Sequence, residues 1–299
     1  MCETCRTPSL TRRTLLGGGV VAPLAVSGAA AAARGKPAVS VGGARSRVLV
    51  FTRTNGYRHA SIPNAIEAIT ELGRGHGFEV VATEDPERFT ARELEQCGAI
   101  VFVNTVGNVL TPGSRQAIGR FVRGGGGWVG VHAAADTEYD WDFYTRLLSG
   151  GRFLAHPLQN QPGRIVRESA NHLSTRHLGR SWQIPIEEFY SFTTNVRDRA
   201  RVLLSIDESS YMQDPNTSYV PGGLSPMPPY IDPGSLTVPI PISGTMGDHP
   251  MCWTKGVGRG LSWYTALGHE AELYGNPTYR RHLLGGLVTA IRHGQRHQR

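Results

Sequence analysis

Residues 124–135 read GGGGWVGVHAAA, which predicts a buried strand that leaves a glycine-rich turn and ends among small residues. In α/β proteins a strand end flanked by small residues presents one side chain to a cleft, because bulkier neighbours would obstruct the sharp turn. Here that side chain is His132, at a place where a hydrolase of this kind carries a serine or cysteine nucleophile. The stretch therefore predicts an α/β fold with a site that resembles a catalytic centre but lacks a nucleophile.

Strand and helix patterns alternate on the N-terminal side of this stretch. Continuous apolar runs predict strands, and amphipathic periodicity or helix-start signals predict helices. Thr90 and Glu93 have the spacing of a capping box, and Thr111-Pro112 is a typical helix start. The predicted strands cover 47–52, 78–83, 99–104 and 128–132, and the predicted helices cover 61–75, a short segment from 90 and a segment from 111. This alternation predicts a doubly wound, mostly parallel sheet with helices on both faces.

The C-terminal part is expected to be rich in β-structure. Residues 201–206 and 260–267 read as strands, and the second of these is expected to form a hairpin with 251–253. A final helix is expected from Asn276-Pro277. Between about 213 and 243 the chain is rich in proline and glycine without a period, which predicts an inserted loop over the surface.

The N-terminus has the pattern of a twin-arginine export signal. Arg12-Arg13 precede an apolar stretch that is too short and too rich in glycine and alanine for a membrane anchor. We expect residues 1–33 to be removed, with cleavage within or just after Ala29–Ala33, and the mature protein to be periplasmic or extracellular. The remaining divisions are expected to be a linker (34–46), the α/β domain (47–292) and a frayed basic tail (293–299).

Charge and cysteine content narrow the function classes. The formal net charge is +7 and falls to +5 once residues 1–33, which hold three arginines and one glutamate, are removed. An exported protein with this modest charge meets no chromosomal DNA, so we do not expect nucleic acid as a partner. Cys97 and Cys252 remain after processing and have apolar surroundings, which favours two buried free thiols over a disulfide.

Candidate site residues follow the strands, because ligands of open α/β sheets bind at the carboxyl ends of the strands. Three of these strand ends carry a histidine, namely His59, His132 and His269. The other polar or aromatic candidates at the strand ends are Asn55, Tyr57, Arg58, Asn104, Asp136, Glu138, Tyr139, Trp141 and Glu270.

Several of these residues also have a purely structural interpretation. His59 could cap the first long helix, and Asp136 or Glu138 could cap the helix that follows them. His156 and His249 both precede proline and are expected to be turn residues. His132 is the strongest functional candidate, because a polar ring at the end of an apolar strand needs a partner.

Five segments together resemble the trehalose-utilisation (ThuA-like) family. They are TNGYRHASI (54–62), GVHAAADTEYDW (130–141), EEFYSF (187–192), HPMCW (249–253) and GRGLSWYTALGH (258–269), which occur in the order expected for that family. The resemblance covers about 47–291 and implies the class I glutamine-amidotransferase-like fold. Members of the family commonly have histidine in place of the nucleophilic cysteine of the glutaminases, and that position is His132 here. The segment 213–243 departs from the family pattern.

The resemblance implies carbohydrate metabolism, in particular the processing of disaccharides or glycosides oxidised to a ketone at C3. Such a ketone acidifies the C2 proton, so His132 is expected to act as the general base of an elimination that hydration completes. Glu188, from the EEFYSF segment, or Glu270 is expected to protonate the leaving oxygen. Asn55, Arg58 or a metal ion is expected to stabilise the enolate, and Tyr57, Tyr139 and Trp141 are candidates for stacking on sugar rings.

A divalent metal ion is the cofactor that the histidines suggest. His59, His132 and His269 could bind it, with Asp136 or Glu270 completing the ligand set. Two other function classes remain open. The fold could serve as a non-catalytic glycan-binding module, whereas a glutaminase is disfavoured because neither cysteine lies at a strand-turn-helix elbow. The sequence does not predict the oligomeric state.

Overall fold

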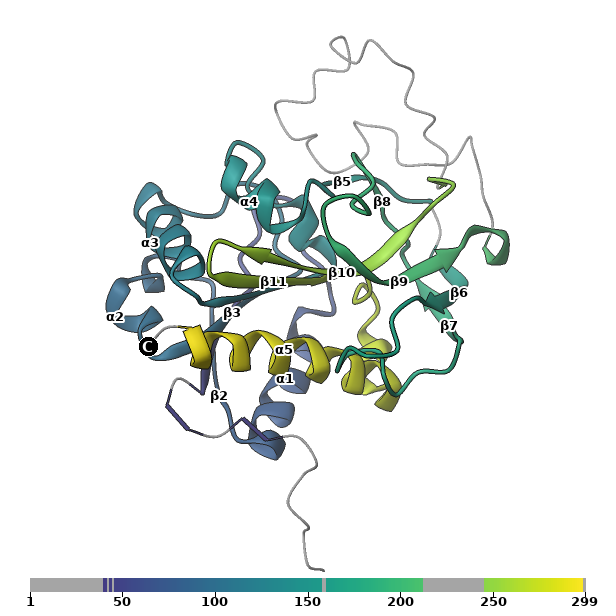
Figure 1. Cartoon of the computed structure of the whole chain (residues 1–299). Helices are drawn as coiled ribbons and strands as arrows, with labels where there is room; N and C mark the ends of the chain where they lie inside the picture. The colour runs from purple at the N-terminus through teal and green to yellow at the C-terminus, as the bar shows by residue number, and fades with distance from the viewer. Residues whose placement is uncertain (1–39, 42, 45, 158–159, 212–244, 298–299) are drawn as a thin grey trace, which may run out of the picture. The chain divides into compact units, whose positions relative to one another are not determined.

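The computed structural model describes residues 40–41, 43–44, 46–157, 160–211 and 245–297. The predicted export signal and the predicted inserted loop at 213–243 therefore lie outside the described residues. The described chain is a mixed α/β fold built on a nine-stranded sheet, as Figure 1 shows. None of its helices has the length and apolar character needed to span a membrane, as far as the described residues go.

One half of the sheet is parallel. Its strands occur in the order β2-β1-β3-β4-β11, and each neighbouring pair is parallel. They are β1 (Arg47–Phe51), β2 (Glu79–Thr83), β3 (Cys97–Val103), β4 (Gly127–Val131) and β11 (Gly260–Thr265). Every residue of β3 and β4 is buried, as expected for parallel strands covered on both faces. The large parallel sheet predicted from these apolar runs is confirmed.

The other half of the sheet is antiparallel and was predicted only in part. It continues from β11 in the order β10-β9-β6-β7, and β10 forms the expected hairpin with β11. These strands are β10 (Pro250–Val257), β9 (Arg201–Asp207), β6 (Gln161–Arg167) and β7 (Ser181–Glu187), and the pair β5 (Phe153–Ala155) and β8 (Ser191–Phe192) forms a separate small sheet. The strands β5 to β8 were not predicted. Strand β6 contains Pro162 and Gly163 and β7 contains Pro185, and both residue types are depleted in strands, so the local sequence did not indicate β6 and β7.

Helices lie on both sides of the strands. In Figure 1, α3 and α4 lie on one side of β11, and α1 and α5 lie on the other. The helices are α1 (Ile62–His76), α2 (Ala91–Leu94), α3 (Pro112–Arg123), α4 (Asp142–Leu147) and α5 (Pro277–His297), and the short 3-10 segments are η1 (Pro86–Arg88), η2 (His132–Asp136), η3 (Glu208–Ser210) and η4 (Ala271–Gly275).

The helix ends test three predictions. Thr90 and Thr111 cap α2 and α3 by accepting the backbone N–H groups of Glu93 and Ser114, both at 3.2 Å. Helix α5 begins at Pro277 as predicted, but it continues through His297. The expectation of a frayed tail from 293 is therefore wrong for residues 293–297. The helix was predicted to be shorter because its last turns are basic and polar, a composition typical of a solvent-exposed chain end.

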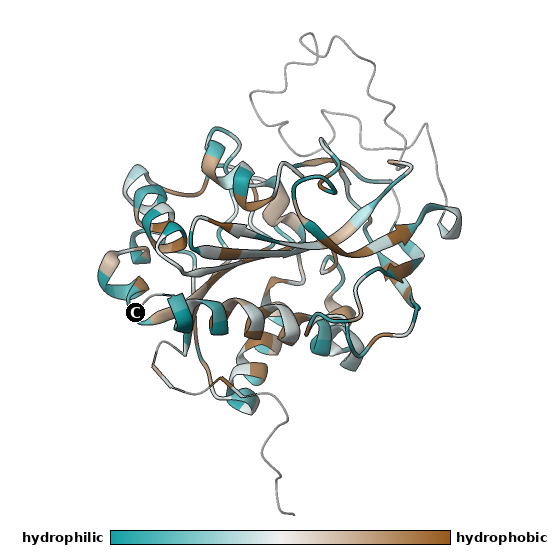
Figure 2. Ribbon diagram, viewed as in Figure 1, coloured by the Kyte–Doolittle hydropathy of each residue, from teal (hydrophilic) through white to brown (hydrophobic). Residues whose placement is uncertain are grey.

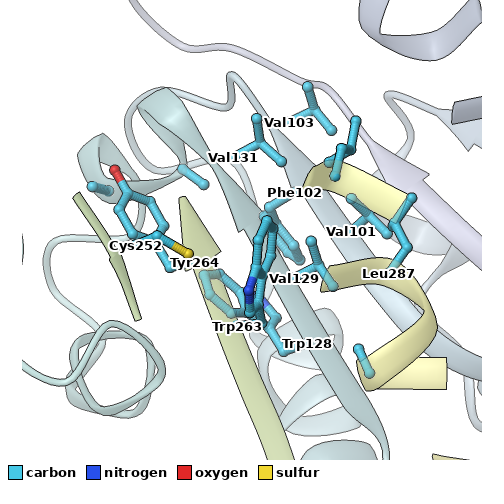
Figure 3. Close-up of a cluster of buried hydrophobic side chains, with 14 of the residues drawn as sticks. Val101, Phe102, Val103, Trp128, Val129, Val131, Cys252, Trp263, Tyr264 and Leu287 are labelled. Carbon is cyan, nitrogen blue, oxygen red and sulfur yellow. The ribbon is translucent and has the colours of Figure 1, made fainter. Parts of the chain in front are cut away.

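The core lies on both faces of the parallel half. Trp263 packs against α5 at Gly286, whereas Phe102 and Trp128 pack against Tyr144 of α4, with ring centroids 5.6 and 5.5 Å apart. Figure 3 shows Phe102, Trp128, Trp263 and Leu287 within this cluster, and all four side chains are fully buried. In Figure 2 hydrophobic residues concentrate on strands, whereas hydrophilic residues line much of α3. The packing holds the carboxyl ends of β1, β4 and β11 in fixed positions at one edge of the sheet, because these three strands are parallel.

Candidate active site

His132 occupies the turn that leaves β4. Its backbone has φ of 49°, in the left-handed region that non-glycine residues rarely adopt, and the next three residues are buried alanines. Such strain is stored where the surrounding structure fixes it, often at a functional site. The turn therefore has the geometry of a strand-to-helix elbow, and it presents an imidazole at the carboxyl edge of the sheet.

Three more polar side chains meet His132. His59 follows β1, His269 follows β11, and Glu188 follows β7 directly. Oε2 of Glu188 lies 3.2 Å from Nε2 of His132 and 3.1 Å from Nδ1 of His269, and these two nitrogens are 3.3 Å apart. The ring centroid of His59 is 4.9 Å from that of His132 and 5.0 Å from that of His269. The structure thus brings together the three histidines predicted at strand ends and Glu188.

The ring orientation of His132 is fixed by one hydrogen bond. Its Nδ1–H donates to the carbonyl oxygen of Ala266 at 2.8 Å, since a carbonyl can only accept. In the neutral ring the lone pair is then on Nε2, which faces Glu188 and His269. Burial lowers the pKa of His132, although the neighbouring Glu188 carboxylate, which favours the charged ring, opposes this effect. The geometry and the pKa direction both favour the neutral ring.

The charges in the cluster shift the pKa values of Glu188, His269 and His59. Burial alone would raise the pKa of Glu188, but its contacts with the imidazoles of His132 and His269, which favour the carboxylate, hold that pKa well below its usual value. For His269 burial is outweighed by the hydrogen bond and the charge of Glu188, which raise its pKa. Burial and the two neighbouring imidazoles lower the pKa of His59 to about 2. Glu188 is therefore the anionic centre of the cluster.

Glu187, next to Glu188, positions the loop that carries His269. Its buried carboxylate accepts three backbone N–H groups, from Gly268 at 2.9 Å, His269 at 2.9 Å and Glu188 at 3.0 Å. Burial raises the pKa of Glu187 to about 8 against these hydrogen bonds. Glu187 thus binds the backbone of the loop, whereas Glu188 contacts the histidine rings.

Sequence reasoning missed two residues of the site. Nε2 of His156 lies 3.3 Å from Oε1 of Glu188, although His156 was expected to be a turn residue. The ring of Tyr190 lies against His132, with centroids 4.2 Å apart. Tyr190 belongs to the EEFYSF segment, which was a usable signal, whereas nothing in the local pattern around His156 indicated its contact. His249 is also not a simple turn residue, because it is buried and its Nε2–H donates to the carbonyl of Tyr190 at 2.8 Å.

Four further candidates lie around the β1 and β3 ends. Tyr57, half exposed, packs edge-on against His59 with centroids 4.8 Å apart, so it borders the cluster. Arg58 instead pairs with Glu84 at 2.6 Å. Asn55 donates to the carbonyl of Asn108. Asn104 is fully buried, and its amide donates to Ser61 and to the carbonyl of Gly268. These hydrogen bonds connect the segments that follow β1, β3 and β11.

The remaining candidates have different surroundings. After β4, the ring of Trp141 packs near Phe143 and Tyr144 in the α4 region. After β11, the carboxylate of Glu270 accepts a hydrogen bond from the side chain of Asn160. Glu138 does not cap the following helix. It accepts the N–H groups of Val109 and Leu110, at 2.7 and 2.8 Å, and pairs with Arg115. Asp136 does not cap that helix either, because its N-cap residue is Trp141 without a side-chain cap. The capping expectation for both residues is therefore wrong.

Arg152 lies beside Asp136 and Tyr139. Its guanidinium stacks over the ring of Tyr139 at 4.4 Å, yet all three of its nitrogens are buried without a hydrogen-bond partner among the described residues. Burial raises the pKa of Asp136 to about 8, although the charge of Arg152 opposes this shift. The region next to Glu188 therefore contains a buried cation and a carboxyl group that tends to stay protonated.

The cysteines agree with the sequence analysis. Cys97 and Cys252 are buried free thiols that lie within strands β3 and β10. Burial raises the pKa of Cys97 to about 12, so this thiol is not the reactive kind. Burial likewise raises the pKa of Cys252 well above its usual value. Neither cysteine occupies the elbow, which is held by His132.

The arrangement supports two kinds of chemistry. A neutral imidazole in contact with a carboxylate and a second imidazole can accept and pass on a proton. The same donors can bind a metal ion, since His59, His132, His269 and Glu188 each offer one atom and these atoms all lie within 4.8 Å of one another. The carboxylate of this set is Glu188, whereas the sequence analysis had considered Asp136 or Glu270 for that place.

The fold and this site define an α/β protein with a histidine at the elbow after β4, and comparisons with known proteins identify its family. The family model for trehalose utilisation (ThuA) matches residues 47–290, so the chain belongs to the ThuA family. A ThuA-like protein from Bacteroides uniformis has 24% identity, a TM-score of 0.63 and coverage of 85% of this chain and 95% of its own. A ThuA-like protein from Parabacteroides merdae has 15% identity and a TM-score of 0.59, with 82% and 89% covered. No curated protein sequence matches the chain.

Proposed function

We propose that this ThuA-family protein is an exported enzyme that processes disaccharides or glycosides oxidised to the ketone at C3. The observation that carries the proposal is the convergence of His132, His269 and Glu188, with contacts of 3.1 to 3.3 Å, at the carboxyl edge of the sheet. The family description, trehalose utilisation, supports a carbohydrate substrate. The paired arginines before the apolar N-terminal stretch support export by the twin-arginine route.

The proposed reaction is an elimination followed by hydration. The C3 ketone acidifies the C2–H bond, and when that bond breaks its electron pair forms an enolate. The enolate expels the C1 oxygen, which leaves a double bond between C1 and C2. Water then adds its oxygen to C1 and its hydrogen to C2, so the net result is hydrolysis with the ketone retained.

His132 is the proposed base of this reaction. Because the hydrogen bond to Ala266 holds its Nδ1–H, the neutral ring has its lone pair on Nε2. The side chain itself has no exposed surface, whereas those of Glu188 and His269 are 9% and 16% exposed. The C2 proton therefore reaches Nε2 of His132 through these two contacts. The same proton then returns through Glu188, which is a carboxylate at rest, to the leaving oxygen. Glu270 is less suitable for that step because Asn160 engages its carboxylate.

The test is NMR observation of a 3-keto-disaccharide incubated with the purified protein and, in parallel, with His132→Ala. We expect the wild type to consume the sugar and the variant to lose at least about 100-fold in rate, the lower range for a general base. His177→Ala is the matched control, because His177 is half-buried and bonds the carbonyl of Thr278, outside the cluster. Full activity in His132→Ala would contradict the assignment. Broadened sugar signals without conversion would instead identify a glycan-binding module.

A further inference from the structure

We propose that His59, His132, His269 and Glu188 bind one divalent transition-metal ion, with zinc as the type. The four residues come from four separate segments of the chain, and three of them are buried. Segments so far apart in sequence have no local reason to bring one donor atom each within 4.8 Å. Their convergence is what a metal site requires, and it is independent of any role in proton transfer.

The spacing of the three closest atoms matches that of metal ligands. Donors about 2.0–2.1 Å from a tetrahedral ion lie about 3.3–3.4 Å from each other. The distances among Nε2 of His132, Nδ1 of His269 and Oε2 of Glu188 are 3.2, 3.1 and 3.3 Å. These three atoms are therefore spaced nearly as three ligands on one face of a tetrahedron. An ion could bind them with small movements of the side chains.

The cluster has more lone pairs than protons to satisfy them. Nε2 of His132 has a lone pair in the tautomer that Ala266 fixes, and a carboxylate can only accept. Nδ1 of His59 is buried and has no hydrogen-bond partner within the described part of the chain. An orphaned nitrogen next to two rings and a carboxylate is a costly arrangement unless something binds it. A cation that accepts lone pairs from all four residues removes this cost.

Neighbouring groups orient the candidate ligands through supporting contacts, as is usual for metal ligands. The carbonyl of Ala266 fixes the ring of His132, and Nε2 of His156 contacts the Glu188 oxygen that faces away from the other two rings, at 3.3 Å. Glu187 fixes the backbone of His269 through its N–H group at 2.9 Å. Such supporting contacts orient ligands and tune their basicity. Three imidazoles and one carboxylate suit zinc and its first-row neighbours rather than magnesium or calcium, which prefer oxygen ligands.

Only the role of the ion, and not its binding, rests on the proposed function. Because the side chains of His269 and Glu188 are the partly exposed members, a ketone would approach the ion from their side. A bound ion would use the lone pair of Nε2 of His132, so the base role proposed for that ring would pass to Oε1 of Glu188, which is not among the three closest ligand atoms. The ion would polarise the C3 ketone and stabilise the enolate oxygen, so that this weaker base would suffice for the C2 proton.

The experiment measures metal binding directly. The purified full chain is freed of metal by dialysis against a chelator and titrated with Co²⁺, then with Zn²⁺ in competition with a chromophoric chelator. We expect one ion per chain, Co²⁺ absorption bands typical of four-coordinate nitrogen and oxygen ligation, and a zinc-dependent rise in melting temperature. His132→Ala and the nearly isosteric Glu188→Gln should each weaken zinc binding by more than about 100-fold, beyond the range for supporting residues.

The matched control is the double variant His293→Ala/His297→Ala. These two histidines stack on the last turns of α5, with centroids 4.2 Å apart, and form the kind of surface pair that binds metal nonspecifically. Zinc binding that survives this control but is lost in Glu188→Gln, with an unchanged circular dichroism spectrum, supports the site. Equal binding by wild type and Glu188→Gln, loss only in the α5 double variant, or no binding overturns it. Zinc binding without turnover of a 3-keto sugar contradicts the proposed function alone.

Discussion

Replacing His282 with asparagine should make the stability of this protein less sensitive to acid. His282 is fully buried, donates from Nδ1–H to the carbonyl of Ser174 at 2.9 Å and accepts at Nε2 from the hydroxyl of Thr265 at 3.1 Å. Burial lowers its pKa to about 3. The unfolded chain, with a histidine pKa of about 6.5, therefore binds the proton first. The stability contribution is complete above that value and is lost as the pH falls from about 6.5 toward about 3.

The magnitude follows from these two pKa values. Between about pH 8 and pH 5, protonation of the unfolded chain at this one residue lowers the free energy of unfolding by about 2 kcal/mol. His282→Asn keeps an N–H group for Ser174 and has no charge to gain. Its free energy of unfolding should therefore fall about 2 kcal/mol less than that of the wild type over the same interval, whatever its absolute stability.

The assay is equilibrium urea unfolding, followed by tryptophan fluorescence and circular dichroism at several pH values. His76→Asn is the control, because it removes a half-buried histidine from the last turn of α1. The other buried histidines contribute equally to wild type and variant, so they cancel in the comparison. Parallel pH profiles for the wild type and His282→Asn would show that His282 is protonated equally in both states, and would refute the reasoning.

Two further changes test the packing and the buried charge. A Cβ at Gly294 would lie 2.0 Å from the carbonyl oxygen of Gly98, so Gly294→Ala should lower the free energy of unfolding by about 1–3 kcal/mol, measured by urea unfolding. Gly275→Ala meets nothing within 4 Å and serves as the control, and equal stabilities would show that α5 can shift freely. Arg152→Met should leave the free energy of unfolding unchanged or higher, because a buried charge without a hydrogen-bond partner among the described residues is replaced by an apolar chain of similar length. A loss above about 1 kcal/mol in that variant would show that the guanidinium has a stabilising partner beyond its stacking on Tyr139.

The centre of the parallel half was predictable because β3 and β4 are buried on both faces. Residues 99–103 and 128–131 are continuous apolar runs, which is the pattern such strands need. The strands β6 and β7 lack that pattern, because they lie at the far edge of the sheet with several exposed residues and contain proline. They pair with each other, and only β6 joins them to the rest of the sheet, through β9, which lies too far along the chain for a local window of sequence to contain it.

The same difference separates the predicted from the missed site residues. His59, His132 and His269 follow strands of the parallel half, and the carboxyl ends of parallel strands meet at one edge, so their proximity could be predicted from the order of elements alone. Glu188 could be named only through the family resemblance. His156 could not be named, because its contact with Glu188 joins two irregular segments that both lie outside the parallel half.

The site therefore depends on both halves of the sheet, because Glu188 follows β7 in the antiparallel half. The parallel strands alone would bring together three imidazoles, which repel one another when charged. Burial lowers the pKa of His59, and this repulsion lowers it further. The residues at the end of β7 supply the negative charge and the backbone contacts that these three rings lack. Glu188 gives the rings a negative partner, and Glu187 fastens the loop of His269 through two backbone hydrogen bonds of 2.9 Å, one of them from Gly268. Because one strand end provides both groups, any change that shifts β7 should disturb the charge of the cluster and the position of His269 together.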